Sequence, residues 1–283
     1  MTFSIVAFDR ETQSFGVAVQ SKFPAVGSAV PWVRADSGAI ATQAWANLSY
    51  GPDGLELLRQ GKSAQEVVDA LTAADDGREH RQLGVVDRSG GAAAYTGSSC
   101  MSWAGHRVGE GFTCQGNILA GAAVVAAMAE AYAVSSEAFP ERLVAALHAG
   151  QREGGDSRGQ QSAALYVARE KASYGGWLDR FIDLRTDDHP APIEELSRLL
   201  EMHRLYFPPS IPEPLTVDAA LAGEIETLLA KLGFAGESGA CSLEDSRGAL
   251  ERWAAVENLE ERMLPGEQID PVVLDFLRKK AAS

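Results

Sequence analysis

The stretch TFSIVAFDRETQSFGVAVQ, residues 2–20, decides the fold. Residues 2–8 and residues 15–20 are rich in β-branched and aromatic side chains, and the polar segment between them is typical of a turn joining two strands. Alternate residues of the first strand place apolar side chains on both of its faces. A strand of this kind is expected to lie between two layers of structure.

Three further strands, a hairpin and five helices are expected before residue 208. Ser63 and Glu66 have the spacing of a capping box, and Ser89-Gly90-Gly91 lies between two apolar runs, as in a hairpin. The strands are expected at residues 38–46, 162–170 and 180–188, and the helices at residues 52–61, 63–75, 118–134, 139–151 and 192–207. Because strands and helices come in runs rather than in regular alternation, the pattern favours an α+β fold.

A proline-rich segment, residues 208–214, divides the chain. Four prolines within this segment predict a stiff, extended linker. Beyond it, helical patterns cover residues 217–233, 243–256 and 271–281. We therefore expect a main domain over residues 1–207, a linker over 208–214 and a three-helix accessory domain over 215–283.

Composition limits the classes of partner. The chain has a net charge of −14 and no basic run, which argues against nucleic acids and anionic membrane surfaces. No apolar run is long enough to span a bilayer, and the first residues lack the pattern of a signal peptide. Cys100, Cys114 and Cys241 form neither a disulfide framework nor a zinc motif. The expectation is a cytoplasmic protein.

One familiar catalytic motif is matched, the G-x-S-x-G nucleophile elbow, by GDSRG at residues 155–159. The elbow requires a strand before its serine and a helix after it, whereas here the predicted helix precedes and the strand follows. We interpret Ser157 as part of a turn, and a serine hydrolase is the least favoured alternative. The five histidines are scattered without metal-binding spacing, so no metal site is predicted.

Thr2 is the more informative candidate because a strand begins directly at this residue. A threonine hydroxyl needs an adjacent base to act as a nucleophile. If Met1 is removed, the α-amine of Thr2 can be that base, because its ordinary pKa of about 7.7–8.0 lies near neutral pH. Thr2 is thus a candidate N-terminal nucleophile.

The order of motifs resembles a known superfamily. TFSIVAFD, FGVAVQSKF and GAIATQA are similar to the opening of the N-terminal-nucleophile (Ntn) hydrolases, including the proteasome β-subunits. The phrases TQAWANLSYGPDGL, WAGHRVGEGFTCQGNILAG, GGDSRGQQSAAL and DLRTDDHP together resemble the bacterial domain-of-unknown-function family ten-twenty-eight, over about residues 1–205. This resemblance implies a four-layer αββα sandwich with Thr2 at one end.

The resemblance also implies roles for single residues. Thr2 would be the nucleophile and its amine the base. Lys22 or Arg34 would lower the pKa of that amine through nearby positive charge, and Asp156 would support the amine. One departure weakens this assignment: Arg34 stands where proteasome subunits carry a lysine, and an arginine cannot act as a proton carrier. A second is Gln20, where those subunits carry an aspartate.

Further implied residues concern the oxyanion and the substrate. Asn117, or a backbone N–H near Gly116 or Ala44, would stabilise the oxyanion. The residues implied to contact polar groups of the substrate are Gln43, Arg158, Gln161 and Ser162. The expected activity is hydrolysis of a small amide or ureido compound through a Thr2 acyl-enzyme, without metal or cofactor.

Two features of the expected function stay open at this point. Residues 215–283 resemble a peptidoglycan-binding helical module, for which we expect an accessory role, such as contacts within a homo-oligomer. The alternative to hydrolysis is a non-catalytic binding or scaffold protein on an Ntn-like fold. That alternative predicts that Met1 is retained or that Thr2 is closed off from any cleft.

Overall fold

The computed structural model describes residues 2–234 and 243–282. The chain divides into two compact units, residues 1–199 and residues 200–283, and each is described by itself. Helix α5 (Pro192–Tyr206) contributes residues to both. Met1 and Cys241, which entered the predictions above, lie outside the described residues.

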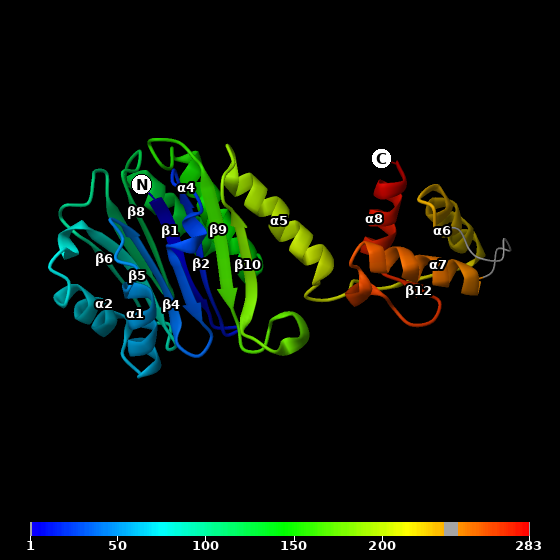
Figure 1. Cartoon of the computed structure of the whole chain (residues 1–283), viewed down its shortest axis with the longest axis horizontal. Helices are drawn as coiled ribbons and strands as arrows, with labels where there is room; N and C mark the ends of the chain where they lie inside the picture. The colour runs from blue at the N-terminus through cyan, green and yellow to red at the C-terminus, as the bar shows by residue number, and fades with distance from the viewer. Residues whose placement is uncertain (1, 235–242, 283) are drawn as a thin grey trace. The chain divides into compact units, whose positions relative to one another are not determined.

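The first unit contains a six-stranded antiparallel sheet with β1 near its middle (Figure 1). Its strand order is β10-β9-β2-β1-β8-β7. The strands are β1 (Thr2–Asp9), β2 (Ser14–Ser21), β7 (Gly105–Gly109), β8 (Phe112–Asn117), β9 (Ser162–Ala168) and β10 (Arg180–Thr186). Because β1 is flanked by β2 and β8, its first residue has a neighbouring strand on each side.

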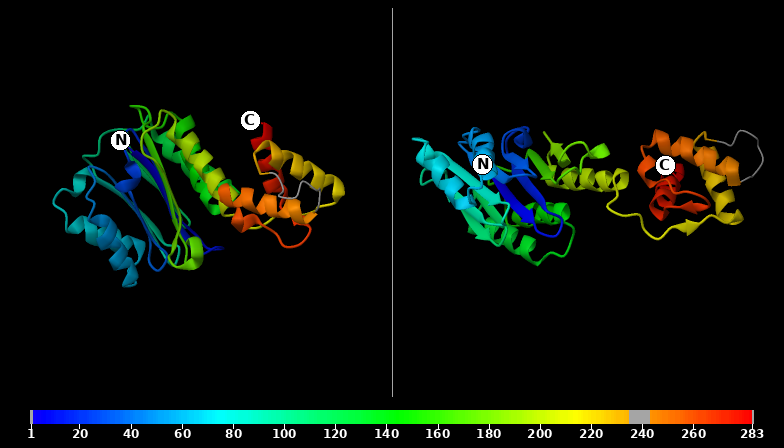
Figure 2. Two further views of the ribbon diagram at one scale, coloured as in Figure 1. Left: turned by 45° about the vertical axis from the view of Figure 1, so that its right-hand side comes forward. Right: turned by 90° about the horizontal axis from the view of Figure 1, so that it is seen from below.

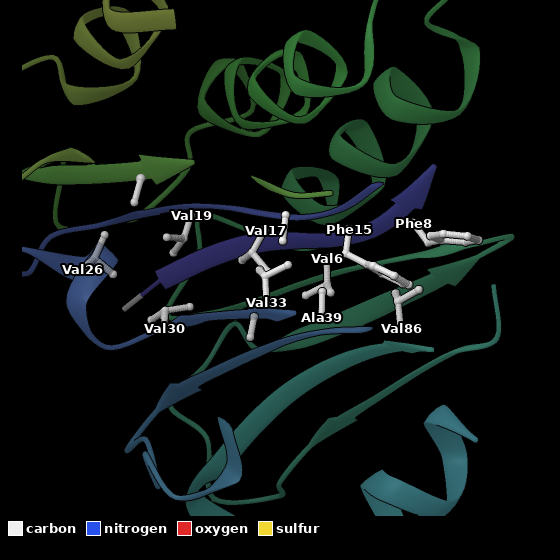
Figure 3. Close-up of a cluster of buried hydrophobic side chains, with 13 residues drawn as sticks. Val6, Phe8, Phe15, Val17, Val19, Val26, Val30, Val33, Ala39 and Val86 are labelled. Atoms are coloured by element: carbon white, nitrogen blue, oxygen red, sulfur yellow. The ribbon is translucent and has the colours of Figure 1, made fainter. Parts of the chain in front are cut away.

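A second, four-stranded sheet packs on the first, face to face. Its strands, in the order β3-β4-β5-β6, are β3 (Pro31–Arg34), β4 (Gly38–Ala44), β5 (Arg81–Asp87) and β6 (Ala92–Thr96). Figure 3 shows the apolar cluster between the sheets, in which Val6 and Val17 of the first sheet meet Val33, Ala39 and Val86 of the second. The two apolar faces predicted for β1 are both used, since the opposite face lies under α4.

Helices cover both outer faces (Figure 2). α1 (Tyr50–Arg59) and α2 (Ala64–Ala73) pack on the four-stranded sheet, whereas α3 (Ala122–Val134) and α4 (Phe139–Arg152) pack on the six-stranded sheet. The layers are therefore helix, sheet, sheet, helix. The predicted α+β class, followed by a helical C-terminal region, is confirmed.

Local signals in the sequence account for several boundaries. Ser63 and Glu66 form the predicted capping box at the start of α2. Gly90, with φ of 81°, sits in the predicted hairpin between β5 and β6. Short 3-10 helices cover Val26–Ser28, Arg78–His80, Tyr174–Gly176 and Glu260–Arg262.

The main differences from the sequence predictions are strands β7 and β8, which were not expected. The helix expected at residues 118–134 begins only at Ala122. β8 alternates Phe112 and Cys114 with Thr113, Gln115 and Asn117, which is the pattern of a strand. Its polar residues, and not its apolar ones, face the second sheet, and all of them are buried. Gly84 of β5 leaves room for this polar face, because a Cβ there would lie 2.3 Å from both Gln115 Oε1 and Thr113 Oγ1.

The second unit is a small helical domain with its own core. It contains α6 (Ala219–Lys231), α7 (Leu243–Val256) and α8 (Pro271–Ala282), with a two-stranded ladder of β11 (Leu215–Thr216) and β12 (Gln268–Ile269). Trp253 is fully buried at the centre of its apolar cluster. No helix in residues 2–234 or 243–282 is both long enough and apolar enough to cross a membrane.

Candidate functional site

The candidate site lies at the end of the sandwich where β1 begins. Thr2 is paired with Ser21 of β2 on one side and with Asn117 of β8 on the other. The Thr2 hydroxyl lies 3.0 Å from the Ser21 hydroxyl, and Thr2 as a whole is 6% exposed. The two flanking strands therefore fix both the backbone and the hydroxyl of Thr2.

Ser21 was not identified from the sequence, although a signal for it was present. The β1–β2 hairpin pairs residues whose numbers sum to 23, from Asp9 with Ser14 to Thr2 with Ser21. The register of an antiparallel hairpin follows from the position of its turn. Centring the predicted turn on DRETQS would thus have placed Ser21 opposite Thr2.

Asp156 is a buried carboxylate that ties three segments together beside the site. Its Oδ2 accepts the backbone N–H of Lys22 at 2.9 Å, and its Oδ1 accepts the backbone N–H of Arg158 at 2.9 Å. The Arg158 guanidinium lies 3.3 Å from Oδ2. Asp156 also forms a backbone bridge with Leu119, two residues after Asn117. Through its carboxylate and its backbone together, Asp156 thus links the end of β2 to the loops that follow β8 and α4.

Three buried amide side chains, those of Gln43, Gln82 and Asn117, lie next to Thr2 and are joined by hydrogen bonds. Gln43 Nε2 lies 3.4 Å from the carbonyl of Thr2 and 2.9 Å from Gln82 Oε1, to which Asn117 Nδ2 also donates at 2.9 Å. The Gln43 Oε1 accepts the hydroxyl of Ser4 at 2.7 Å. All of these side chains are at most 2% exposed. Both ends of the Gln43 amide are engaged by Ser4 and Gln82, so Gln43 supports the site from inside, and its contact with a substrate stays a prediction from the sequence.

The two residues predicted to place positive charge near the Thr2 amine, Lys22 and Arg34, lie in different parts of the first unit. Lys22 contributes its backbone N–H to Asp156, while its ammonium donates to the carbonyl of Gln160 at 3.1 Å. Arg34 is bound to Asp36 at 2.6 Å and pairs with Gly38, at the far end of β4 from Gln43. Five residues of strand correspond to about 17 Å. The structure thus does not bring Arg34 to Thr2, because the short strand β3 runs away from the site.

The remaining predicted substrate contacts divide into buried and exposed residues. Ser162 is fully buried and donates its hydroxyl to the carbonyl of Phe23 while accepting the N–H of Val26, so it holds a loop and is not available to a substrate. Gln161 is partly exposed and donates to Asp188 at 3.2 Å. Arg158 is exposed. Ser157, in the loop between α4 and β9, donates to the carbonyl of Ile118, as expected of a turn residue.

Exposed apolar side chains stand on three loops at the same end of the sandwich. Phe23 follows β2 and Trp45 follows β4, while the carbonyl of Met101 accepts the N–H of Ile118, the residue after Asn117. Each of the three side chains is more than half exposed. This end of the molecule therefore offers apolar contacts around a polar interior.

Comparison with known proteins agrees with this architecture. The model of the family of unknown function DUF1028 matches residues 2–196. The chain belongs to this family. The crystal structure of a DUF1028 protein from Silicibacter pomeroyi is similar to our DUF1028 chain, with 34% identity and a TM-score of 0.66, over 72% of this chain and 86% of the other. No curated protein matches.

The tail of this DUF1028 protein has a second match. Residues 212–277 match the family described as "Putative peptidoglycan binding domain". Both families named from the motifs in the sequence are therefore confirmed. Neither comparison attaches a reaction to DUF1028, so the chemistry rests on the residues around Thr2.

Proposed function

We propose that the first unit is an N-terminal-nucleophile hydrolase that cleaves the C–N bond of a small amide or ureido compound through Thr2. One observation carries this proposal: the Thr2 hydroxyl is held against Ser21 at the start of a central strand, with Asn117 on the neighbouring strand. A hydroxyl nucleophile and an amide donor placed side by side are two of the parts needed for acyl transfer, and the third, the base, would be the α-amine of Thr2 itself.

The reaction requires removal of Met1, since the nitrogen of Thr2 is otherwise part of a peptide bond. Thr2 Oγ1 then attacks the substrate carbonyl carbon while its proton passes to the free α-amine. The C–N bond breaks as the α-amine gives this proton to the departing nitrogen, which leaves an ester on Thr2. Water hydrolyses the ester with the same amine as base. The Asn117 amide is the donor for the oxyanion, and Asp156 holds the surrounding loops.

Removal of Met1 is the first testable consequence. We expect the intact mass of the purified protein to be lower than that of the full sequence by one methionine residue, because Thr2 is small enough for Met1 to be trimmed. A variant with Thr2→Glu is the control, since a bulky second residue should keep Met1 in place. Full retention of Met1 in the wild-type protein would contradict a mechanism that uses the α-amine of Thr2.

A second candidate is a non-catalytic binding protein, and one observation favours it. Thr2 is only 6% exposed, and Gln43 and Ser162, two of the residues expected to touch a substrate, are buried. This alternative predicts that a β-lactone, which acylates hydroxyl nucleophiles, does not label a protein from which Met1 has been removed. Labelling of Thr2 by the β-lactone would contradict the non-catalytic alternative and support the hydrolase.

For the second unit we propose an accessory binding role. It contains a cavity of about 220 Å³ with an apolar lining that includes Leu250 and Met263 and polar groups that include Arg247 and Gln268. The family match makes peptidoglycan the first polymer to test. We expect the chain to sediment with insoluble peptidoglycan and expect Leu250→Asp to reduce this; a chain that stays in the supernatant contradicts the proposal. Cytoplasmic location and homo-oligomer formation stay predictions from the sequence.

A further inference from the structure

Gln82 connects the two sheets at the level of Thr2. It lies at the start of β5 in the four-stranded sheet and is fully buried. Its Oε1 accepts Asn117 Nδ2 and Gln43 Nε2, both at 2.9 Å. Its Nε2 donates to the carbonyl of Gly116 at 2.8 Å. One side chain of the second sheet thus contacts both the backbone and the side chain of residues 116–117 in the first sheet.

The hydrogen bonds of Gln82 are saturated, which fixes its orientation. An amide oxygen has two lone pairs, and both are used by N–H donors. The amide nitrogen has two hydrogens and faces the Gly116 carbonyl, the Thr96 hydroxyl at 2.9 Å and the Gly105 carbonyl at 3.2 Å. Turning the amide over would place NH₂ against two donors and the oxygen against two carbonyls. Gln82 therefore offers Asn117 an acceptor in one fixed place.

We propose that Gln82 is a positioning residue for the Thr2 reaction, and that it acts by aiming the amide of Asn117. One hydrogen of Asn117 Nδ2 is taken by Gln82, and no other hydrogen bond to the Asn117 side chain occurs within residues 2–234 and 243–282. Because Asn117 is the direct cross-strand neighbour of Thr2, its second N–H is left to meet the oxyanion that forms there. This inference rests on the proposed hydrolase function.

A second buried glutamine, Gln115, has different hydrogen-bond partners from Gln82 and can serve as a control. Gln115 is also fully buried between the sheets but lies two residues deeper along β8, where its Nε2 donates to the hydroxyl and the carbonyl of Ser4. It has no hydrogen bond to the side chain of Asn117. Gln115→Met therefore makes the same chemical change as Gln82→Met in a similar environment, away from the oxyanion donor.

The test uses the full chain without Met1 and a β-lactone probe. Thr2 Oγ1 forms a bond to the lactone carbonyl carbon, the ring C–O bond breaks, and the hydroxyl proton passes through the α-amine to the ring oxygen. The product is an ester on Thr2 and a free alcohol, with no further reactant. The maximal acylation rate and the half-saturating probe concentration are measured separately by intact mass.

We expect Gln82→Met to lower the maximal acylation rate about 10–100-fold, with little change in the half-saturating concentration. Asn117→Ala should lower it by about 10²–10³-fold, the usual effect of losing an oxyanion donor. Since Gln82 acts through Asn117, the double variant should be no slower than Asn117→Ala alone. Gln115→Met should acylate at the wild-type rate, even if it unfolds at a similar temperature to Gln82→Met.

Several outcomes would overturn the inference. An acylation rate for Gln82→Met equal to that of Gln115→Met, or multiplicative effects in the double variant, would show that Gln82 has only a structural role. If Gln82→Met does not fold, Gln82→Glu serves instead, because in its protonated form it keeps an oxygen acceptor for Asn117 and an O–H donor toward the Gly116 carbonyl. It should retain most of the rate, and a rate as low as that of Asn117→Ala would overturn the inference.

A separate readout distinguishes failure of this inference from failure of the proposed function. The side-chain NH₂ signals of Asn117 in an NMR spectrum should shift or broaden in Gln82→Met and stay in place in Gln115→Met. Unchanged Asn117 signals contradict the positioning role whatever the labelling shows. The opposite outcome is also possible: the wild-type protein without Met1 is not labelled, yet the Asn117 signals change in Gln82→Met. In that case Gln82 does position Asn117, but the hydrolase proposal is contradicted, and the positioning has no catalytic role.

Discussion

Replacing Thr2 with alanine is expected to abolish β-lactone labelling and amide hydrolysis, by roughly 10⁴–10⁶-fold, the scale on which loss of a nucleophile slows an acyl-transfer enzyme. The substitution removes the only atom proposed to bond to the carbonyl carbon. It also removes the hydrogen bond to Ser21, which is worth about 1 kcal/mol, so the fold should persist. Intact mass after probe treatment and the unfolding midpoint in urea measure the two effects.

Two matched variants complete this experiment. Thr2→Ser keeps a hydroxyl at the same place and is still small enough for Met1 to be trimmed, so labelling should be retained. Thr186→Ala removes the hydroxyl of another buried strand threonine, 7% exposed, whose Oγ1 has no hydrogen bond with any described residue. It should label like the wild-type protein. If Thr2→Ala is still labelled, the nucleophile is another residue. If that labelling is then lost when Ser157→Ala is added to Thr2→Ala, the nucleophile is Ser157.

Many elements of both units could be predicted because they depend on local signals. The two strands of the first hairpin, the capping box at Ser63 and the helices of the second unit follow from periodicity and turn residues. Asp156 was located by a motif resemblance, and the structure shows it buried beside the end of β2. These features need only residues close together in the sequence, or a pattern shared with a family.

The rest depends on how two sheets face one another, which the sequence pattern does not specify. Gln82 looks like one polar residue at the start of an apolar strand, and its role appears only when β8 is placed opposite it. β8 was not predicted although its residues alternate, and the face that it turns to the other sheet is the polar one, where core side chains are usually apolar. Arg34 was assigned to the site from a family position, but β3 pairs it with Gly38 at the opposite end of β4.

Replacing Arg262 with methionine is expected to destabilise the second unit by about 3–5 kcal/mol, the usual effect of breaking a buried ion pair from one side. The Arg262 side chain is 6% exposed and donates to Asp270, whose side chain is fully buried, at 2.6 Å. Its guanidinium also donates to the carbonyls of Arg204 and Leu205. The variant leaves the Asp270 carboxylate in an apolar interior without its cation.

Asp270 also binds the first turn of α8, so the loss of stability in Arg262→Met should be confined to the second unit. Its Oδ1 accepts the N–H of Val272 at 2.8 Å in the first turn of α8. Hydrogen exchange should therefore accelerate in α8 and around Trp253, while exchange in the first unit and labelling of Thr2 should be unchanged. Equal exchange throughout both units would contradict the division into two units with separate cores.

A surface arginine on α8 provides the matched control. Arg278 pairs with Glu224 at 2.7 Å, with both side chains at least 40% exposed, so Arg278→Met should cost less than about 1 kcal/mol. The double variant Arg262→Met/Asp270→Asn should recover part of the stability lost in Arg262→Met, because the uncompensated charge is gone. If Arg262→Met and Arg278→Met unfold at the same urea concentration, the buried pair does not hold this unit together. In that case its stability comes from the apolar cluster around Trp253 alone.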